Sequence, residues 1–529
     1  MKNKPKIILI TLFLALAKLS LAQTVQEEIE FDIPKTLFFT DEKIWIRTSI
    51  NSLGNIAESQ VLYAELIDEK SRSWALGKIP LENGKALNYL GLDSKIPSGN
   101  YLLRVYTRIS ANDPTGNGIK QRLVTVLNPS LPPRSTSEGE VDFKVSSSSN
   151  TLVKSSYSAN QNIELDLPSE EIESIHVSVM NPYLEGREGE LNSQDIYQTI
   201  NPEIFVPELF GHIVHGKLIG AEIDTTQTYF LSAHGEKSAL FTDRPDLDGN
   251  LFFDLGGFRH WDHLLIQVEE GTAIPDLEIV SPGPKTTFKT GFSIPELVIH
   301  PEDAKWLEEL KMASALEPYY NQEYRYDSIP VVTGFVADQT YLLDDYTRFE
   351  TVETVIKEYV PGVAIRRRDK LKEFRLLNNP ANSMFDSNPL MMVDALPVFN
   401  SDMLANFNPK FFKKLEVLNR EFYLNDRTYA GVINFSSYEN NFGLFPVPDQ
   451  VLYLDYPGVN PFISFEGDFA QKSVIDTRSP DFRSVLYWEE DVSGKKVEFS
   501  TSNMKGIYEL VIQFKDKNKS PITETLKVD

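Results

Sequence analysis

Hydrophobic and polar residues alternate in short runs along most of this 529-residue chain. In residues 44–50, 175–179 and 508–514, apolar side chains or threonine occupy every second position. A period of two predicts strands that bury one face, and clusters of proline, glycine and serine between such runs are typical of β-sandwiches. The pattern therefore predicts a mainly β protein made of tandem β-sandwiches.

Two segments show a helical spacing instead. In residues 351–360 and 301–315, apolar side chains recur at intervals of three and four, which predicts helices with one buried face. The first helix is followed by Pro361-Gly362 and by two short β-like runs, Val363–Arg368 and residues 372–377. These two runs are predicted to form a hairpin.

The stretch of residues 389–438 mixes both kinds of element. The apolar run Leu390–Val393 predicts a buried strand. Asn408 can cap a short helix in which Pro409 takes the first position, where a missing N–H costs nothing. Gly431 permits a close backbone approach before a last strand. The expected local order is strand, turn, helix, strand, turn, strand, which is an α+β unit.

The N-terminus has the features of a secretory signal peptide. Lys2, Lys4 and Lys6 precede an apolar run, and a small-residue cleavage site ends at Ala22. Later apolar runs are all too short for a spanning helix, so no direct membrane span is expected. The predicted units are a signal peptide (1–22), a first β-sandwich (23–128), a second (141–201), a third (205–280), a helical connector (301–329), the α+β unit (330–445) and a C-terminal β-sandwich (446–529).

The α+β unit resembles the plug domain of TonB-dependent outer-membrane receptors. The resemblance covers residues 340–440 and rests on the order of elements and on the turn Val360-Pro361-Gly362-Val363. The chain departs from plugs at one turn, where it has Asp394-Ala395 and plugs usually carry Asp-Gly. This departure argues against a tight glycine-type turn there.

The sandwiches also resemble known modules. Residues 39–45 and 96–107 are similar to the second macroglobulin-type domain of α2-macroglobulin-like proteins. The third sandwich, with its predicted hairpin at residues 246–255, resembles the non-catalytic carboxypeptidase regulatory-like sandwich. Secreted multidomain proteins of Bacteroidetes-type bacteria join macroglobulin-like, regulatory-like and plug-like units in this order. The resemblance implies a periplasmic, outer-membrane-associated protein.

A receptor plug is normally followed by its own barrel, and this chain has no room for one. Residues 446–529 could supply about eight spanning strands of about 9–11 residues each, whereas receptor barrels are much larger. The resemblance therefore implies a plug that serves a separate outer-membrane β-barrel in trans.

The charge of the chain limits its partners. With 76 acidic and 52 basic residues, the net charge of −24 repels nucleic acid over most of the surface. One basic cluster stands out in the predicted hairpin of the plug-like unit, and it comprises Arg366, Arg367, Arg368, Lys370 and Lys372. Two interpretations remain open, a solvated turn or an electrostatic anchor for an acidic partner.

No sequence feature favours catalysis or a cofactor. The chain has no cysteine, which excludes disulfides and thioester chemistry, and it has no Gly-x-Ser-x-Gly, phosphate-loop or His-Glu-x-x-His motif. The histidine pairs His212/His215 and His260/His263 have the three-residue spacing of metal ligands on a helix. On strands such positions face opposite sides, so no metal site is expected. His176, between apolar strand positions, is expected to be solvated.

Three functions remain open from the sequence. The favoured one is a non-enzymatic periplasmic plug that docks on and seals the mouth of a separate barrel. The very large translocon barrel of the type 9 secretion system is an attractive partner, because such a pore must be sealed when empty. The alternatives are a module that binds polysaccharide or secreted peptide in an outer-membrane uptake system, and a hydrolase built on the histidine pairs.

Overall fold

The computed structural model describes residues 26–52, 55–56, 58–113, 117–133, 152–184, 187, 189–201, 206–220, 222–259, 261–269, 276–320, 324–326, 335–368, 371–425, 427–465, 481–492, 494–516 and 518–529. The predicted signal peptide, His260 and Lys370 lie outside these residues. In the part of the chain that is described, no helix is both long and apolar enough to cross a membrane.

The N-terminal sandwich (residues 27–127) packs two sheets on one core. The first sheet contains β1 (Glu27–Asp32), β3 (Lys43–Ser52), β4 (Asn55–Ile56) and β7 (Lys85–Gly91). The second has the order β2 (Leu37–Phe39), β9 (Lys120–Leu127), β8 (Gly99–Tyr106), β5 (Val61–Ile67) and β6 (Ser73–Pro80). Ile44, Ile46 and Ile50 are buried between the sheets, as the alternation predicts. Trp45, on the opposite face, is also buried because it packs against Trp488 of the second sandwich.

The second sandwich joins an early segment of the chain to its C-terminal segment. Its main sheet has the order β10 (Ser156–Tyr157), β37 (Ile522–Val528), β36 (Gly506–Phe514), β12 (Ile172–Val179) and β34 (Val485–Glu490). A second pair consists of β11 (Asn162–Asp166) and β35 (Lys496–Ser500).

This pairing corrects the sequence analysis, which assigned residues 141–201 and 446–529 to separate sandwiches. Strand β12 is central and has β36 on one side and β34 on the other, so both segments are needed for one sheet. Alternation along a strand reveals which face is buried but carries no information about which strand lies beside it.

The third sandwich also borrows a late strand. One sheet has the order β17 (Asn250–Asp254), β14 (Ile213–Leu218) and β19 (Leu277–Ile279). The other has the order β16 (Ser238–Asp243), β15 (Tyr229–His234), β18 (His263–Val268) and β32 (Leu452–Asp455).

The predicted hairpin at residues 246–255 is a different kind of turn. Gly249 has the expected positive φ, +81°, and its N–H donates to the carbonyl of Asp246 at 3.0 Å. However, the strands on either side of this turn, β16 and β17, belong to different sheets. The turn therefore crosses from one layer of the sandwich to the other.

Short elements connect these sandwiches. Helix α3 (Ala304–Tyr320) packs on the core of the second sandwich through Leu310 and Ala313. The connecting elements are η1 (Ser110–Asn112), α2 (Ser193–Ile196), β13 (Tyr197–Asn201) paired with β20 (Lys285–Phe288), η2 (Pro301–Asp303), α3 (Ala304–Tyr320), and β21 (Tyr324–Tyr326) paired with β33 (Ile463–Phe465).

The distal unit (residues 335–445) is the α+β part of the molecule. Its sheet has the order β22 (Gln339–Leu342), β28 (Phe412–Leu418), β31 (Val432–Ser437), β26 (Leu390–Val393) and β27 (Leu396–Pro397). The remaining elements are η3 (Leu343–Asp345), α4 (Val352–Tyr359), β23 (Val363–Arg368), β24 (Leu371–Asn378), β25 (Ser383–Met384), α5 (Ser401–Asn406), η4 (Pro409–Phe411), β29 (Phe422–Leu424), β30 (Arg427–Tyr429) and η5 (Phe442–Leu444).

Most predicted elements of this unit are present. The Thr351 side chain caps α4, and the Asn408 side chain accepts from the N–H of Lys410 at the start of η4. A Cβ atom at Gly431 would lie 2.4 Å from the carbonyl oxygen of Leu418, so the close approach expected there occurs. The sequence analysis missed α5 and the β29–β30 hairpin.

The Asp394-Ala395 turn contradicts the expectation from the sequence. Both residues have positive φ, 46° and 63°, and they close a tight turn between β26 and β27 although neither is glycine. The Asp394 carboxylate accepts hydrogen bonds from the backbone N–H and the hydroxyl of Ser437 and from the N–H of Phe442. These bonds hold the turn in a conformation that its residues disfavour.

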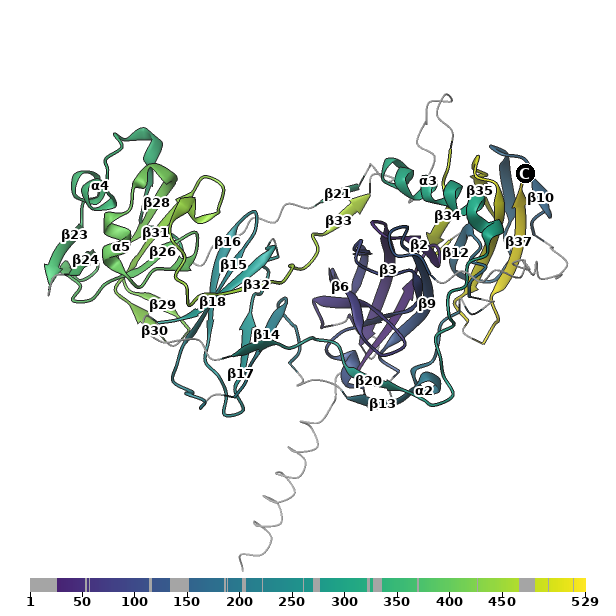
Figure 1. The fold of residues 1–529 in the computed structure, drawn as a ribbon, viewed down its shortest axis with the longest axis horizontal. Coiled ribbons are helices and arrows are strands. Elements are labelled where there is room, and N and C mark those ends of the chain that lie inside the picture. Colours follow the sequence, from purple (N-terminus) through teal and green to yellow (C-terminus); the bar gives the residue numbers. More distant parts are fainter. Residues whose placement is uncertain are drawn as a thin grey trace, which may run out of the picture.

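The chain runs outward to the distal unit and then returns. Figure 1 shows the distal unit at one end of the long axis and the N-terminal and second sandwiches at the other. The return passes through β32 in the third sandwich, β33 in the ribbon with β21, and β34–β37 in the second sandwich. The distal unit is therefore inserted in the third sandwich, which is itself inserted in the second.

Candidate functional site

The predicted basic cluster lies on the β23–β24 hairpin of the distal unit. The two strands are antiparallel, with Val363 opposite Leu376 and Arg367 opposite Lys372. Val363, Leu376 and Phe374 are buried in the core that α4 and α5 cover. The base of the hairpin is thus fixed by packing, and its far end lies at the outer end of the molecule in Figure 1.

The three arginines are exposed at the end of β23. The side chains of Arg366, Arg367 and Arg368 form no ion pair or hydrogen bond with any described residue. In the sheet order β23-β24-β25, β23 is an edge strand. Side chains alternate along a strand, so Arg366 and Arg368 share one face and Arg367 lies on the other. The structure therefore places three guanidinium groups, unpaired within its described part, along one edge strand.

Lys372 lies in a different environment. It is 7% exposed, and its Nζ lies 2.5 Å from Glu353 Oε2 and 2.5 Å from Asn406 Oδ1. Hydrogen bonds from Lys357 and Lys372 lower the pKa of Glu353 to about 2. Lys372 therefore fastens the hairpin to α4 and to the end of α5, and its charge is matched internally.

An apolar side chain lies beside the arginines. Leu371, opposite Arg368 in the hairpin, is 59% exposed. Farther along β24, the strand of Leu371, the Arg375 side chain forms an ion pair with Glu373 and so differs from the three arginines of β23. The sequence analysis did not single out Leu371. Its position within the basic run, at the end of a predicted hairpin, could have indicated that it is exposed. The exposed tip thus combines three available cations with one apolar contact.

The histidine pair His212/His215 is separated by its strand, as predicted. His212 Nδ1 lies 2.8 Å from Glu208 Oε1, and its Nε2 lies 2.9 Å from the hydroxyl of Tyr456. The His215 ring instead stacks on Phe252 with a centroid distance of 4.6 Å. The second pair cannot be placed because His260 lies outside the described residues. Among the described residues, no group of three or more His, Asp or Glu side chains is arranged for a metal ion.

Glu208 is the centre of a buried polar junction between the N-terminal and third sandwiches. Its carboxylate accepts from the hydroxyl of Tyr63 at 2.7 Å and from the N–H of Ile213 at 2.9 Å, and Arg108 Nε lies 3.3 Å away. Burial lowers the pKa of His212 to about 4. Both oxygens of this carboxylate are engaged, so the junction serves to join the sandwiches.

His176 corrects another expectation. It was expected to be solvated, but it is 9% exposed and lies near the carboxylate of Asp32 in the N-terminal sandwich. The outer face of its sheet packs on that sandwich, as the hydrogen bond from Trp488 Nε1 to Asp32 Oδ2 at 2.9 Å shows. Burial lowers the pKa of His176.

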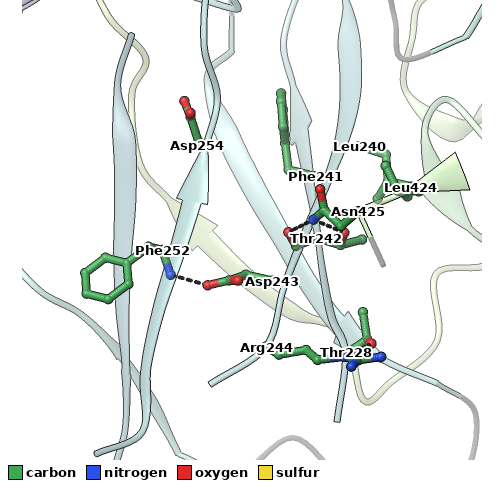
Figure 2. Close-up of a pocket in the computed structure, with 10 residues that line it drawn as sticks. All are labelled: Thr228, Leu240, Phe241, Thr242, Asp243, Arg244, Phe252, Asp254, Leu424 and Asn425. Carbon is green, nitrogen blue, oxygen red and sulfur yellow. Dashed lines mark hydrogen bonds between the residues drawn. The ribbon is translucent and has the colours of Figure 1, made fainter. Parts of the chain in front are cut away.

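A cavity of about 450 Å³ lies between β16, β17 and the end of β29. Figure 2 shows Asp243 between the two strands, where it accepts the N–H of Phe252 at 2.6 Å. Asn425 Nδ2 donates to the carbonyl of Thr242 at 2.6 Å and so joins the distal unit to the third sandwich. Burial raises the pKa of Asp243. The cavity is partly polar and could admit a small neutral ligand, but its lining holds no paired nucleophile and base among the described residues.

The fold described above defines the class, a mainly β protein with several sheets in sandwich-like domains. No protein-family model and no curated protein match the chain. Among solved structures, it is similar to the α2-macroglobulin of Salmonella, with 10% identity and a TM-score of 0.17 over 96% of this chain and 23% of that one. The native α2-macroglobulin of E. coli gives 10% identity and a TM-score of 0.17, over 96% and 22% of the two chains. The chain thus spans about a quarter of the length of these proteins.

Proposed function

We propose that the distal unit is a plug, which docks on and seals the periplasmic mouth of a separate outer-membrane β-barrel. One observation carries the proposal. The unit that resembles receptor plugs in sequence lies at one end of an elongated molecule and presents Arg366, Arg367 and Arg368 without partners among the described residues. A terminal position allows this unit to enter a pore while the sandwiches remain outside.

The charge distribution supports a specific docking contact. The chain carries a net charge of −24, so an acidic partner is repelled by most of its surface and attracted at the arginine edge. Such complementarity fixes orientation and speeds association more than it adds affinity. The fitting partner surface is therefore an acidic rim with an apolar site for Leu371, which is 59% exposed.

The mounting of the distal unit also supports a plug. The hydroxyl of Ser232 donates to the carbonyl of Ala395, and Gln267 Nε2 donates to the carbonyl of Pro397, both at 2.9 Å. The chain leaves the distal unit through β32, a strand of the third sandwich. A blocking element needs shape and support rather than reactive groups, and this mounting supplies the support.

The partner we propose is the outer-membrane translocon barrel of the type 9 secretion system, with this protein in the periplasm of a Bacteroidetes-type bacterium. The argument is one of need, because a very large pore requires a seal when it is empty. The plug proposal requires only a separate outer-membrane barrel, and it holds whether or not that barrel is the type 9 translocon.

Affinity capture from detergent-solubilised outer membranes tests the proposal. Tagged full-length protein is expected to recover one large barrel in near-stoichiometric amount. The triple variant Arg366→Glu, Arg367→Glu and Arg368→Glu is expected to lose at least tenfold in recovery at low salt. A matched control makes the same charge change on the second sandwich and its helix, with Lys305→Glu, Lys311→Glu and Lys505→Glu.

The outcomes separate clearly. Loss in the arginine variant with retention in the control supports docking through β23. Equal loss in both variants means that net charge alone governs capture and contradicts a specific anchor. If the wild-type protein recovers no barrel, the plug proposal fails.

One observation favours the alternative of a ligand-binding module. The cavity in Figure 2 is lined by Phe241 together with the carboxylates of Asp243 and Asp254, a combination that suits a sugar ring. Titration calorimetry with neutral oligosaccharides tests this function. Saturable heat with the wild-type protein supports it, and its absence removes the one feature that favours it.

A further inference from the structure

The interface between the distal unit and the third sandwich is the starting point. Phe230, Ser232 and His234 alternate along β15 and share the face of its sheet that meets the distal unit. Phe230 packs edge-on against Phe399 with a centroid distance of 5.3 Å, and Ser232 donates to the carbonyl of Ala395. This face of the sheet is therefore covered only while the distal unit is docked.

His234 is the unusual residue of this interface. Its side chain is fully buried, and neither ring nitrogen has a hydrogen-bond partner among the described residues. The ring stacks on His263 with a centroid distance of 5.6 Å and meets Phe442 of the distal unit edge-on at 4.6 Å. A potential cation is thus enclosed by two aromatic rings, and the described part of the chain offers no acceptor for its protons.

The groups around His234 offer no charge compensation within the described residues. On β18 the facing group is His263, itself a potential cation, and on β16 it is Ser238, whose hydroxyl donates to Asn440 Oδ1 of the distal unit. From η5 the facing group is Phe442. The nearby carboxylates of Asp262 and Asp455 act on His263 rather than on His234.

We propose that His234 makes the docking of the distal unit on the third sandwich a proton-sensitive latch. While the His234 imidazole is neutral, the distal unit stays docked. A protonated imidazole needs water to solvate its charge, so protonation favours release of the distal unit. This inference goes beyond sealing, because it assigns to the molecule a way to move the distal unit.

The direction of the effect follows from linkage. Burial, helped by His263, lowers the pKa of His234 to about 3 in the docked state. Once water reaches the ring, its pKa returns to about 6.5. The docked state therefore keeps its full stability above about pH 6.5 and loses it as pH falls below this value. The docking equilibrium shifts by about tenfold per pH unit, or about 30-fold between pH 7.5 and 5.

The remaining contacts are suited to a separable interface. Apolar contact is added by Leu240, which packs on a hydrophobic cluster of the distal unit. The other contacts are mostly hydrogen bonds from side chains to backbone carbonyls, such as Gln267 to Pro397, with one exposed ion pair between Arg427 and Glu269. Water can replace such bonds at little cost, unlike the contacts of an apolar interface.

Paired spin labels on the full-length chain test the latch. The sequence contains no cysteine, so Leu247→Cys in the third sandwich, 87% exposed, and Leu371→Cys in the distal unit, 59% exposed, give one label on each side. Distance distributions are measured at pH 7.5 and pH 5. We expect a second, longer population at pH 5 that is absent from the variant His234→Leu. His176→Gln, which alters a buried histidine at another interface, is expected to keep the pH response.

Two results would overturn the latch. One is an unchanged distribution between the two pH values in the wild-type protein, and the other is the same change in His234→Leu. Circular dichroism at both pH values separates release from unfolding, since release leaves the strand signal intact. No barrel is present in this experiment, so its failure leaves the proposed docking function untouched.

Discussion

At the scale of single residues, the sequence predicts conformations that depend on local chemistry. Gly431 was recognisable as a position of close approach, and its φ of +85° shows why another residue fits poorly. The Asp394-Ala395 turn was not recognisable, because the side chain of Asp394 is held by Ser437 and Phe442, which come much later in the chain. Strain that is offset by distant hydrogen bonds leaves no local pattern.

Substitution of Ala395 tests this account of the turn. Ala395 has a φ of 63°, so Ala395→Gly is expected to stabilise the distal unit by about 1 kcal/mol. Ala364→Gly, on the regular strand β23, is expected to destabilise it by about 0.5–1 kcal/mol. Both values come from urea unfolding followed by hydrogen exchange in residues 335–445. Destabilisation by both changes would show that the turn is unstrained.

At the scale of elements, the long and strongly patterned ones were predicted and the short ones were not. The spacing of apolar residues located α4, and alternation located β23 and β24. Helix α5 has six residues and was missed, although Asn400 was available as its cap. Alternation also showed three arginines near the end of a strand, but the burial of Lys372 depends on Glu353 from another element.

The Lys372–Glu353 pair predicts an acid response of the distal unit. Hydrogen bonds from Lys357 and Lys372 lower the folded-state pKa of Glu353 to about 2, below its unfolded value of about 4.5. The ion pairs of Glu353 with these two lysines therefore contribute their full stability above about pH 4.5 and lose it as pH falls toward 2.

The variant Glu353→Gln is expected to be less stable than wild type at pH 7 and to show a flatter decline between pH 4.5 and 2.5. Glu358→Gln, at an exposed position on the same helix, serves as the control and is expected to follow the wild-type curve. Thermal unfolding at a series of pH values measures both. Parallel curves for wild type and Glu353→Gln would refute the role of the pair.

At the scale of the whole molecule, the fold class was predicted and the path of the chain was not. Periodicity identified β12 and β36 of the second sandwich but could not show that these two strands pair. The burial of Trp45 and His176 follows from contacts between sandwiches. These contacts depend on which sandwiches pack against each other, and no local pattern in the sequence shows this packing.

Deletion of residues 481–529 tests the nested arrangement. This change removes β34 to β37, so β12 loses both neighbours, and Leu510, Ile512 and Phe514 leave the shared core. Amide exchange in residues 152–184 is expected to rise to that of an unfolded segment, while residues 335–445 stay protected. Retained protection in residues 152–184 would show that this segment folds by itself, as the sequence analysis had predicted.

The most direct test of the central claim is site-specific photo-crosslinking in cells. A photoreactive amino acid replaces Leu371, at the exposed tip of the β23–β24 hairpin. In a second strain it replaces Leu131, which is 45% exposed and accepts the N–H of Ser98 in the N-terminal sandwich. We predict one adduct from position 371 that contains a large outer-membrane barrel, and none from position 131. The absence of a barrel adduct at position 371, with the protein folded and exported, would contradict the proposal that the distal unit docks in a pore.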